Sequence, residues 1–116
     1  GKIRANIEMR NAQQEQTLKL YEKSVLSALG DVESALVNYS KEQVRYRSLL
    51  VAVDANRRAL AISNDLYTQG LIAFLNVLDA ERTLYTSEND LAQSEANMAS
   101  NLVALYKALG GGWNTN

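Results

Sequence analysis

Uncharged residues recur at every seventh position from residue 18 to residue 67 of the chain. The positions are Leu18, Val25, Val32, Tyr39, Tyr46, Val53, Leu60 and Tyr67. A seven-residue apolar repeat is typical of an α-helix that packs on another helix in the coiled-coil manner. The repeat predicts one helix over about residues 2–69, on the order of 100 Å long at 1.5 Å per residue.

The columns beside this repeat are only partly apolar. One flank holds Tyr21, Ala28, Ala35 and Leu49, and the other holds Leu29, Leu36 and Leu50. Polar residues interrupt these flanks at Glu42, Gln43, Asn56, Arg57, Ser63 and Asn64. Two interpretations remain open: a loosely packed helix face, or a face turned toward solvent or a partly hydrated channel wall.

A second heptad pattern predicts a second helix over about residues 74–109. Its apolar column is Val77, Leu84, Leu91, Met98 and Leu105, with Leu78, Tyr85, Ala92, Ala99 and Tyr106 beside it. The helix is expected to end at Leu109, since three glycines follow and glycine is a strong stop signal. Residues 110–116 then form a glycine-rich tail, in which Trp113 packs either on the last turn or on another element.

An acidic column accompanies the second pattern at the same spacing. It consists of Glu81, Glu88 and Glu95, and no basic residue lies between Thr83 and Tyr106. Such a column is usually a solvated face of a helix. The alternative is a surface that lines an aqueous space or meets a basic partner.

The break between the two patterns is the candidate functional region. It contains Gly70 and a short apolar run without a basic residue, so the tip is placed at about residues 70–73. Apolar side chains exposed at a hairpin tip favour docking of a partner. The expected fold is all-α: a long antiparallel coiled-coil hairpin of one long helix and one of about half its length, forming a single domain. Residues 3–36 of the long helix would be left uncovered, which indicates that the chain is part of a larger assembly or a piece cut from one.

Composition excludes several classes of function. The 116 residues carry a net charge of −1, with no cysteine, histidine or proline. Balanced charge argues against nucleic-acid binding, and the missing thiols and imidazoles argue against most metal and cofactor sites. No apolar run approaches the roughly 18 residues of a membrane-spanning helix. We therefore expect no enzyme activity, no cofactor and no membrane span.

Three segments resemble TolC-type outer-membrane efflux factors, in the branch that serves resistance-nodulation-division pumps. Residues 66–82 read LYTQGLIAFLNVLDAER, which is similar to the periplasmic tip of that family. Residues 101–113, NLVALYKALGGGW, resemble the end of its conserved region, and residues 1–7, GKIRANI, resemble the entry into its second long helix. The resemblance covers essentially the whole chain and implies the second half-repeat of such a protein.

The resemblance implies a transport function. Family members are homotrimers that form a helical tunnel through the periplasm of Gram-negative bacteria, beneath the outer membrane. Each repeat supplies one long helix and one half-length helix. The implied partner is a periplasmic adaptor protein of a tripartite efflux pump. The alternative is a free-standing coiled-coil module that oligomerises or binds helices without any conduit.

The resemblance also implies roles for individual residues. Gly70, Leu71 and Ile72 match the tip that contacts the adaptor, although Gly70 could simply end a helix. Tyr67 matches a tyrosine that links the closed aperture, or it continues the packed heptad. Asn76 and Asp79 match acidic positions around the constriction, and their spacing of three places both on one helix face. Asn76 departs from that pattern, while Asp79 could instead pair with Arg82 or cap the helix.

Overall fold

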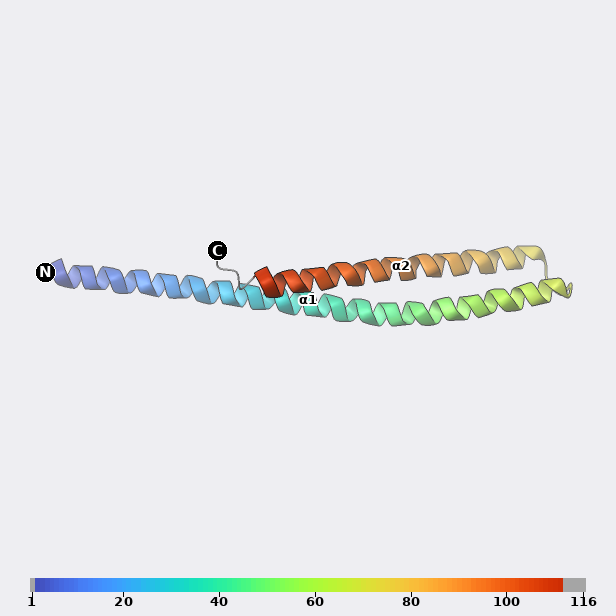
Figure 1. Ribbon diagram of the computed structural model, residues 1–116, viewed down its shortest axis with the longest axis horizontal. Coiled ribbons are helices and arrows are strands. Elements are labelled where there is room, and N and C mark those ends of the chain that lie inside the picture. The colour runs from blue at the N-terminus through green and yellow to red at the C-terminus, as the bar shows by residue number, and fades with distance from the viewer. Residues whose placement is uncertain (1, 112–116) are drawn as a thin grey trace. The chain divides into compact units, whose positions relative to one another are not determined.

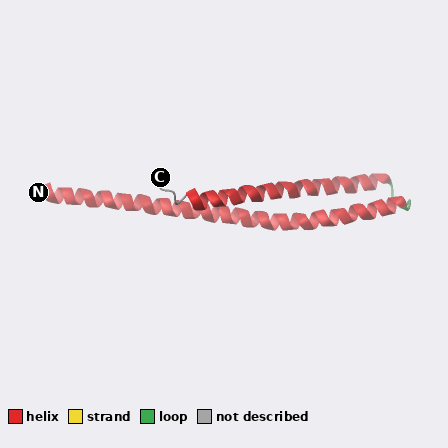
Figure 2. Cartoon of the chain, viewed as in Figure 1, coloured by secondary structure: helices red, strands yellow, loops and turns green. Residues whose placement is uncertain are grey.

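The computed structural model describes residues 2–111, which form two helices. Helix α1 spans Lys2–Thr68 and helix α2 spans Phe74–Gly111 (Figure 1). A loop of residues 69–73 joins them (Figure 2). The predicted all-α class, with one long helix and one of about half its length, is confirmed over the described residues.

The end of α2 differs from the sequence-based expectation. The helix continues through Gly110 to Gly111, two residues past the end predicted at Leu109. A glycine inside a helix is less favourable than alanine by only about 1 kcal/mol, so one glycine does not by itself stop a helix. The proposed packing of Trp113 concerns a residue outside the described range.

The chain divides into two compact units, and the first of them is a helical hairpin of residues 37–102. Its two helical segments run antiparallel, because contacts pair early residues of one with late residues of the other. Asn101 donates a hydrogen bond to the Asn38 carbonyl at 3.3 Å, and the rings of Tyr67 and Phe74 meet at the other end.

The core of the hairpin is narrow and combines apolar with small polar side chains. Its buried residues are Val53, Val77, Leu84, Ser87 and Ser94. The column that begins at Val77 is therefore confirmed as the inner face of α2. The neighbouring column points outward instead, with Leu78, Tyr85 and Tyr106 exposed. Serines fill the other inner column, because a small side chain lets the two helices pack closely.

Most polar interruptions of the α1 heptads lie on its packed face. Glu42, Gln43, Asn56 and Ser63 are half-buried, whereas Arg57 and Asn64 are exposed. Leu50, on the other flank, is exposed as well. The half-buried polar residues therefore belong to the packing between the helices, as the first of the two interpretations proposed.

The second unit comprises the described residues 2–36 and 103–111. Ala35 is buried there, and Val25, Ala28 and Val32 are half-buried, while every residue from 2 to 24 is exposed. The uncovered stretch is thus shorter than the predicted residues 3–36. Over the described range, neither helix is apolar enough along its length to cross a membrane.

Candidate functional site

The tip turn is built from backbone hydrogen bonds around Gly70. Gly70 has a φ of 78°, and its N–H donates to the Tyr67 carbonyl at 2.9 Å. The Leu71 N–H donates to the Leu66 carbonyl, also at 2.9 Å. This pair of bonds is the Schellman motif, in which a residue with positive φ ends a helix. Gly70 therefore ends α1, which is compatible with either interpretation offered from the sequence.

The constraint at Gly70 is conformational rather than steric. A Cβ added to this glycine would meet no heavy atom within 4 Å. A positive φ is nevertheless unfavourable for residues with a side chain, because Cβ approaches the backbone carbonyl. The position thus requires glycine for its backbone geometry while its surroundings remain open.

Several apolar side chains around this turn are exposed, and we refer to them as the apolar tip: Tyr67, Leu71, Phe74 and Leu75. Leu71 is 66% exposed, whereas Ile72 is half-buried. Exposed apolar clusters on protein surfaces commonly mark interaction sites. Sequence reasoning selected Leu71 and Ile72 but missed Phe74 and Leu75, although the same apolar run contains all four.

Tyr67 and Phe74 link the two helices across the loop. Their ring centroids lie 5.2 Å apart with the planes tilted by 54°, a favourable geometry for an aromatic pair. Tyr67 is 45% exposed, so its ring contacts Phe74 and solvent together. The tyrosine continues the heptad column and also forms part of the tip surface.

The first turn of α2 carries little to stabilise its amino end. The Asn76 N–H donates to the Ala73 carbonyl at 3.1 Å, and no acidic residue lies in this turn. Alanine is a poor residue immediately before a helix, because it has no side-chain oxygen to accept from the free N–H groups. The beginning of α2 therefore depends on the packing of Val77 and Phe74 more than on capping.

Asn76 and Asp79 both lie on the exposed surface of α2. Asp79 is the sixth residue of the helix, so it does not cap the helix start. Within residues 2–111, no ion pair joins Asp79 to Arg82. The backbone carbonyl of Asp79 accepts a bond from the Thr83 hydroxyl at 3.0 Å. Among the described residues, the Asp79 carboxylate has no ion-pair partner.

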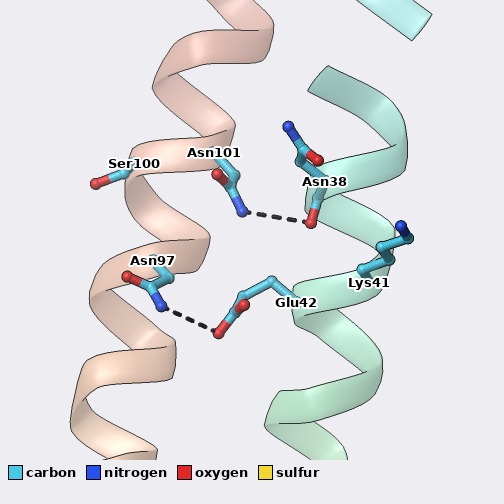
Figure 3. Close-up of a pocket in the computed structure, with 6 residues that line it drawn as sticks. All are labelled: Asn38, Lys41, Glu42, Asn97, Ser100 and Asn101. Carbon is cyan, nitrogen blue, oxygen red and sulfur yellow. Dashed lines mark hydrogen bonds between the residues drawn. The ribbon is translucent and has the colours of Figure 1, made fainter. Parts of the chain in front are cut away.

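A polar groove of about 360 Å³ lies between the helices at the far end of the hairpin from the tip. In Figure 3, Asn97 points toward Glu42 and Asn101 toward the Asn38 backbone, while Lys41 and Ser100 point away from the gap. Asn97 donates to the Glu42 carboxylate at 3.5 Å. Sequence reasoning did not single out this groove, although Glu42 was noted as an interruption of the heptads.

The acidic column follows one edge of the helix pair. Arg57 contacts the Glu88 carboxylate at 3.5 Å, and Tyr46 donates to Glu95 at 3.4 Å. Two of the three carboxylates therefore have partners on α1. No group of three or more potential metal ligands occurs among the described residues.

Comparison with known proteins finds outer-membrane efflux proteins that are similar to this chain. The family model described as outer membrane efflux protein matches residues 1–111. A pyoverdine export outer membrane protein of Pseudomonas putida, OpmQ, is 38% identical across 97% of the chain and 24% of its own length. The solvent efflux pump outer membrane protein SrpC of the same species is 34% identical across 100% of the chain and 25% of its own length.

Two further similarities involve a cation system and a solved structure. The cation efflux system protein CusC of Escherichia coli is 32% identical across 97% of the chain and 25% of its own length. The structure of the outer-membrane channel OprN superposes with a TM-score of 0.71 and 37% identity, across 97% of the chain and 25% of that protein. The chain therefore spans about a quarter of the length of the relatives it matches.

Proposed function

The chain belongs to the outer membrane efflux protein family, and on that premise we propose that it forms a periplasmic helical hairpin of an efflux channel. The resemblance to efflux factors noted from the sequence is thereby confirmed. In the proposed role the hairpin lines part of a conduit and binds a periplasmic adaptor protein through its tip. It performs no chemistry on the exported compound.

The exposed apolar tip is the observation that carries this proposal. Leu71, Phe74 and Leu75 leave much of their apolar surface in solvent at the end of the hairpin. Each Å² of apolar surface that a partner covers contributes roughly 25 cal/mol, before the losses of association are subtracted. An adaptor with an apolar surface at its own end would cover these side chains.

Association of three copies is part of the proposal. The outward column of α2 supports it, because Leu78, Tyr85 and Tyr106 are exposed at heptad spacing with Ala92 and Ala99 between them. A helix with an apolar column on each of two faces can pack on two neighbours. The inner column is already used within the hairpin, so the outward column is available to a second copy.

Residues near the tip would control the aperture of such a trimer. Asp79 would form a ring of three carboxylates that repel one another and attract cations. Asn76 would add a neutral ring on the same face, and Tyr67 would link neighbouring helices through its ring or hydroxyl. Charge removal by Asp79→Asn should reduce cation preference in single-channel recordings of a channel that contains this hairpin. An unchanged preference would remove Asp79 from the aperture.

Adaptor binding is tested with a matched pair of surface variants. Leu71→Asp places a charge on the tip, while Val51→Asp places one on α1 at a position with similar exposure, 69% against 66%. Binding to immobilised adaptor proteins of efflux pumps is measured by biolayer interferometry, with helicity checked by circular dichroism. We expect Leu71→Asp to weaken binding at least tenfold and Val51→Asp to leave it unchanged.

The alternative, a coiled-coil module without a conduit, predicts a different result. A generic helical hairpin does not require its tip, so Leu71→Asp would bind as the parent chain does. Equal weakening by both variants would indicate that binding involves the sides of the hairpin. Either result would overturn the proposed role of the tip.

A further inference from the structure

The heptad column of α1 extends from the hairpin toward the amino terminus. The column next to it on the helix surface differs between the residues inside the hairpin and the residues before it. In the hairpin this neighbouring column contains Glu42 and Asn56. At steps of seven toward the amino terminus, the same column contains Ala35, Ala28 and Tyr21. Residues 18–36 of α1 thus repeat the apolar pattern without the polar side chains.

The inner face of α2 holds two buried serines, and one of them has a polar partner on α1. Ser87 is buried, and its hydroxyl accepts a hydrogen bond from the Asn56 side chain at 3.0 Å. Next to it, Glu88 contacts Arg57 at 3.5 Å. The Ser87 hydroxyl donates to the Leu84 carbonyl of its own helix, so its second hydrogen bond, the one it accepts, has to come from a neighbouring helix. The location of α2 therefore depends on where such donors occur.

Residues 18–36 of α1 supply neither partner. At steps of seven, the position of Arg57 corresponds to Leu36, Leu29 and Glu22. Glu88 of a second copy packed there would face leucine or another carboxylate, and Ser87 would face alanine or tyrosine. Yet the apolar column of α1 continues through Val32, Val25 and Leu18. The two valines are half-buried and Leu18 is exposed, so residues 18–36 offer a second seam for α2.

We propose that the Asn56–Ser87 and Arg57–Glu88 pairs direct α2 onto its own hairpin and disfavour its pairing with residues 18–36 of a second copy. Polar residues inside a helix pair commonly act in this way. They weaken the pair relative to an apolar seam, but they penalise a wrong partner more. The inference concerns only the pairing of helices, so it does not depend on the proposed transport function.

The test moves the polar pair to the other half of α1. Ala28 and Leu29 stand four repeats before Asn56 and Arg57, so Ala28→Asn with Leu29→Arg copies the pair in the same columns. The control, Leu26→Asn with Ser27→Arg, adds the same two side chains at exposed positions outside those columns. Association of the full chain is measured by sedimentation velocity, with helicity followed by circular dichroism.

We expect the copied pair to raise the association constant about 5- to 30-fold, as one or two well-formed polar contacts would. The control should leave it at the level of the parent chain. Adding Ser87→Ala to the copied pair should abolish the gain, because the transplanted asparagine then lacks its acceptor. A gain no larger than that of the control, or one that survives Ser87→Ala, would overturn the proposal.

A reciprocal variant introduces no new polar group and therefore tests the same idea without the risk of misfolding by a buried asparagine. Asn56→Ala with Arg57→Leu gives the hairpin the residues found at positions 28 and 29. The two halves of α1 then present the same side chains to α2 at these positions. We expect self-association to increase, and an association constant equal to that of the parent chain would also overturn the proposal.

Discussion

Asn56 of α1 donates a side-chain hydrogen bond to Ser87 of α2 at 3.0 Å, across the buried face of the hairpin. Ser87 in turn donates to the Leu84 carbonyl of its own helix at 2.8 Å. One heptad later, Ser94 is fully buried and its hydroxyl has no partner within the described residues. Two serines in the same column thus have opposite hydrogen-bonding states.

This difference predicts opposite effects of the same substitution. Ser87→Ala leaves the Asn56 amide without its acceptor and should lower the free energy of unfolding by about 1–2 kcal/mol. Ser94→Ala removes an unpaired hydroxyl and should leave stability unchanged or raise it slightly. Urea unfolding followed by circular dichroism measures both, and equal losses for the two variants would contradict the assignment.

Two glycines provide a second matched pair. Gly70 has a positive φ, so Gly70→Ala should lower the free energy of unfolding by about 1–2 kcal/mol. Gly30 lies within α1 in open surroundings, so Gly30→Ala should raise stability by up to about 1 kcal/mol. Thermal unfolding distinguishes the two, and a stabilised Gly70→Ala variant would mean that the turn differs from the one described.

Burial separates two valines in the hairpin. Val77 is 1% exposed and Val51 is 69% exposed. Val77→Ala removes buried methyl groups and leaves a cavity, so we expect a loss of about 1.5–3 kcal/mol. Val51→Ala should change stability by less than about 0.5 kcal/mol, as is usual for surface positions. If Val77→Ala and Val51→Ala lower the free energy of unfolding in urea by similar amounts, Val77 does not lie in the core.

The Arg57–Glu88 contact should contribute little to the stability of the correct pair. Its atoms lie 3.5 Å apart and both side chains are well exposed, at 65% and 38%. We expect a double-mutant cycle with Arg57→Ala and Glu88→Ala to give a coupling below about 1 kcal/mol, which 1 M salt removes. A larger coupling that does not depend on salt would show that the Arg57–Glu88 contact is more buried from solvent than these exposed fractions indicate.

Backbone exchange should differ along α1. Residues 2–24 are exposed throughout, so no tertiary packing protects the helix there. Hydrogen exchange followed by mass spectrometry should show these amides exchanging faster than those around Val53. Equal protection in both regions, at concentrations where the chain is monomeric, would indicate that residues 2–24 are covered.

The helices and the inner column of α2 could be predicted from the sequence because both follow from periodicity. Val53 belongs to the heptad column of α1, Val77 and Leu84 belong to that of α2, and all three are buried in the hairpin. A column of regular apolar residues needs no knowledge of its partner to be recognised.

The second column of the core could not be predicted in this way. Leu78 and Tyr85 are more apolar than Ser87 and Ser94, yet the serines are buried and Leu78 and Tyr85 are exposed. The choice depends on the half-buried side of α1, where Glu42 and Asn56 lie, and on how closely two helices approach. The hydrophobicity of one helix alone carries no information about the polar residues of its partner or about the distance between the two helices.

Gly70 was identified from the sequence as part of the tip, because a glycine in a break between two helical patterns commonly marks the residue at which the backbone turns. Phe74 was missed as a surface residue, since its contact with Tyr67 arises only when the loop brings the two helix ends together. The roles of Tyr67, Asn76 and Asp79 at an aperture stay predictions.

The turn at Gly70 has a consequence for how this hairpin can change. Its two defining hydrogen bonds join backbone atoms only, from Gly70 and Leu71 to the carbonyls of Tyr67 and Leu66. No side chain between positions 71 and 75 supplies a hydrogen bond to the reversal of the chain. The shape of the tip and the chemistry it presents are therefore set by different atoms. New binding preferences could arise by exchanging Leu71 or Leu75, with Gly70 retained to preserve the bend and Phe74 retained to support the beginning of α2.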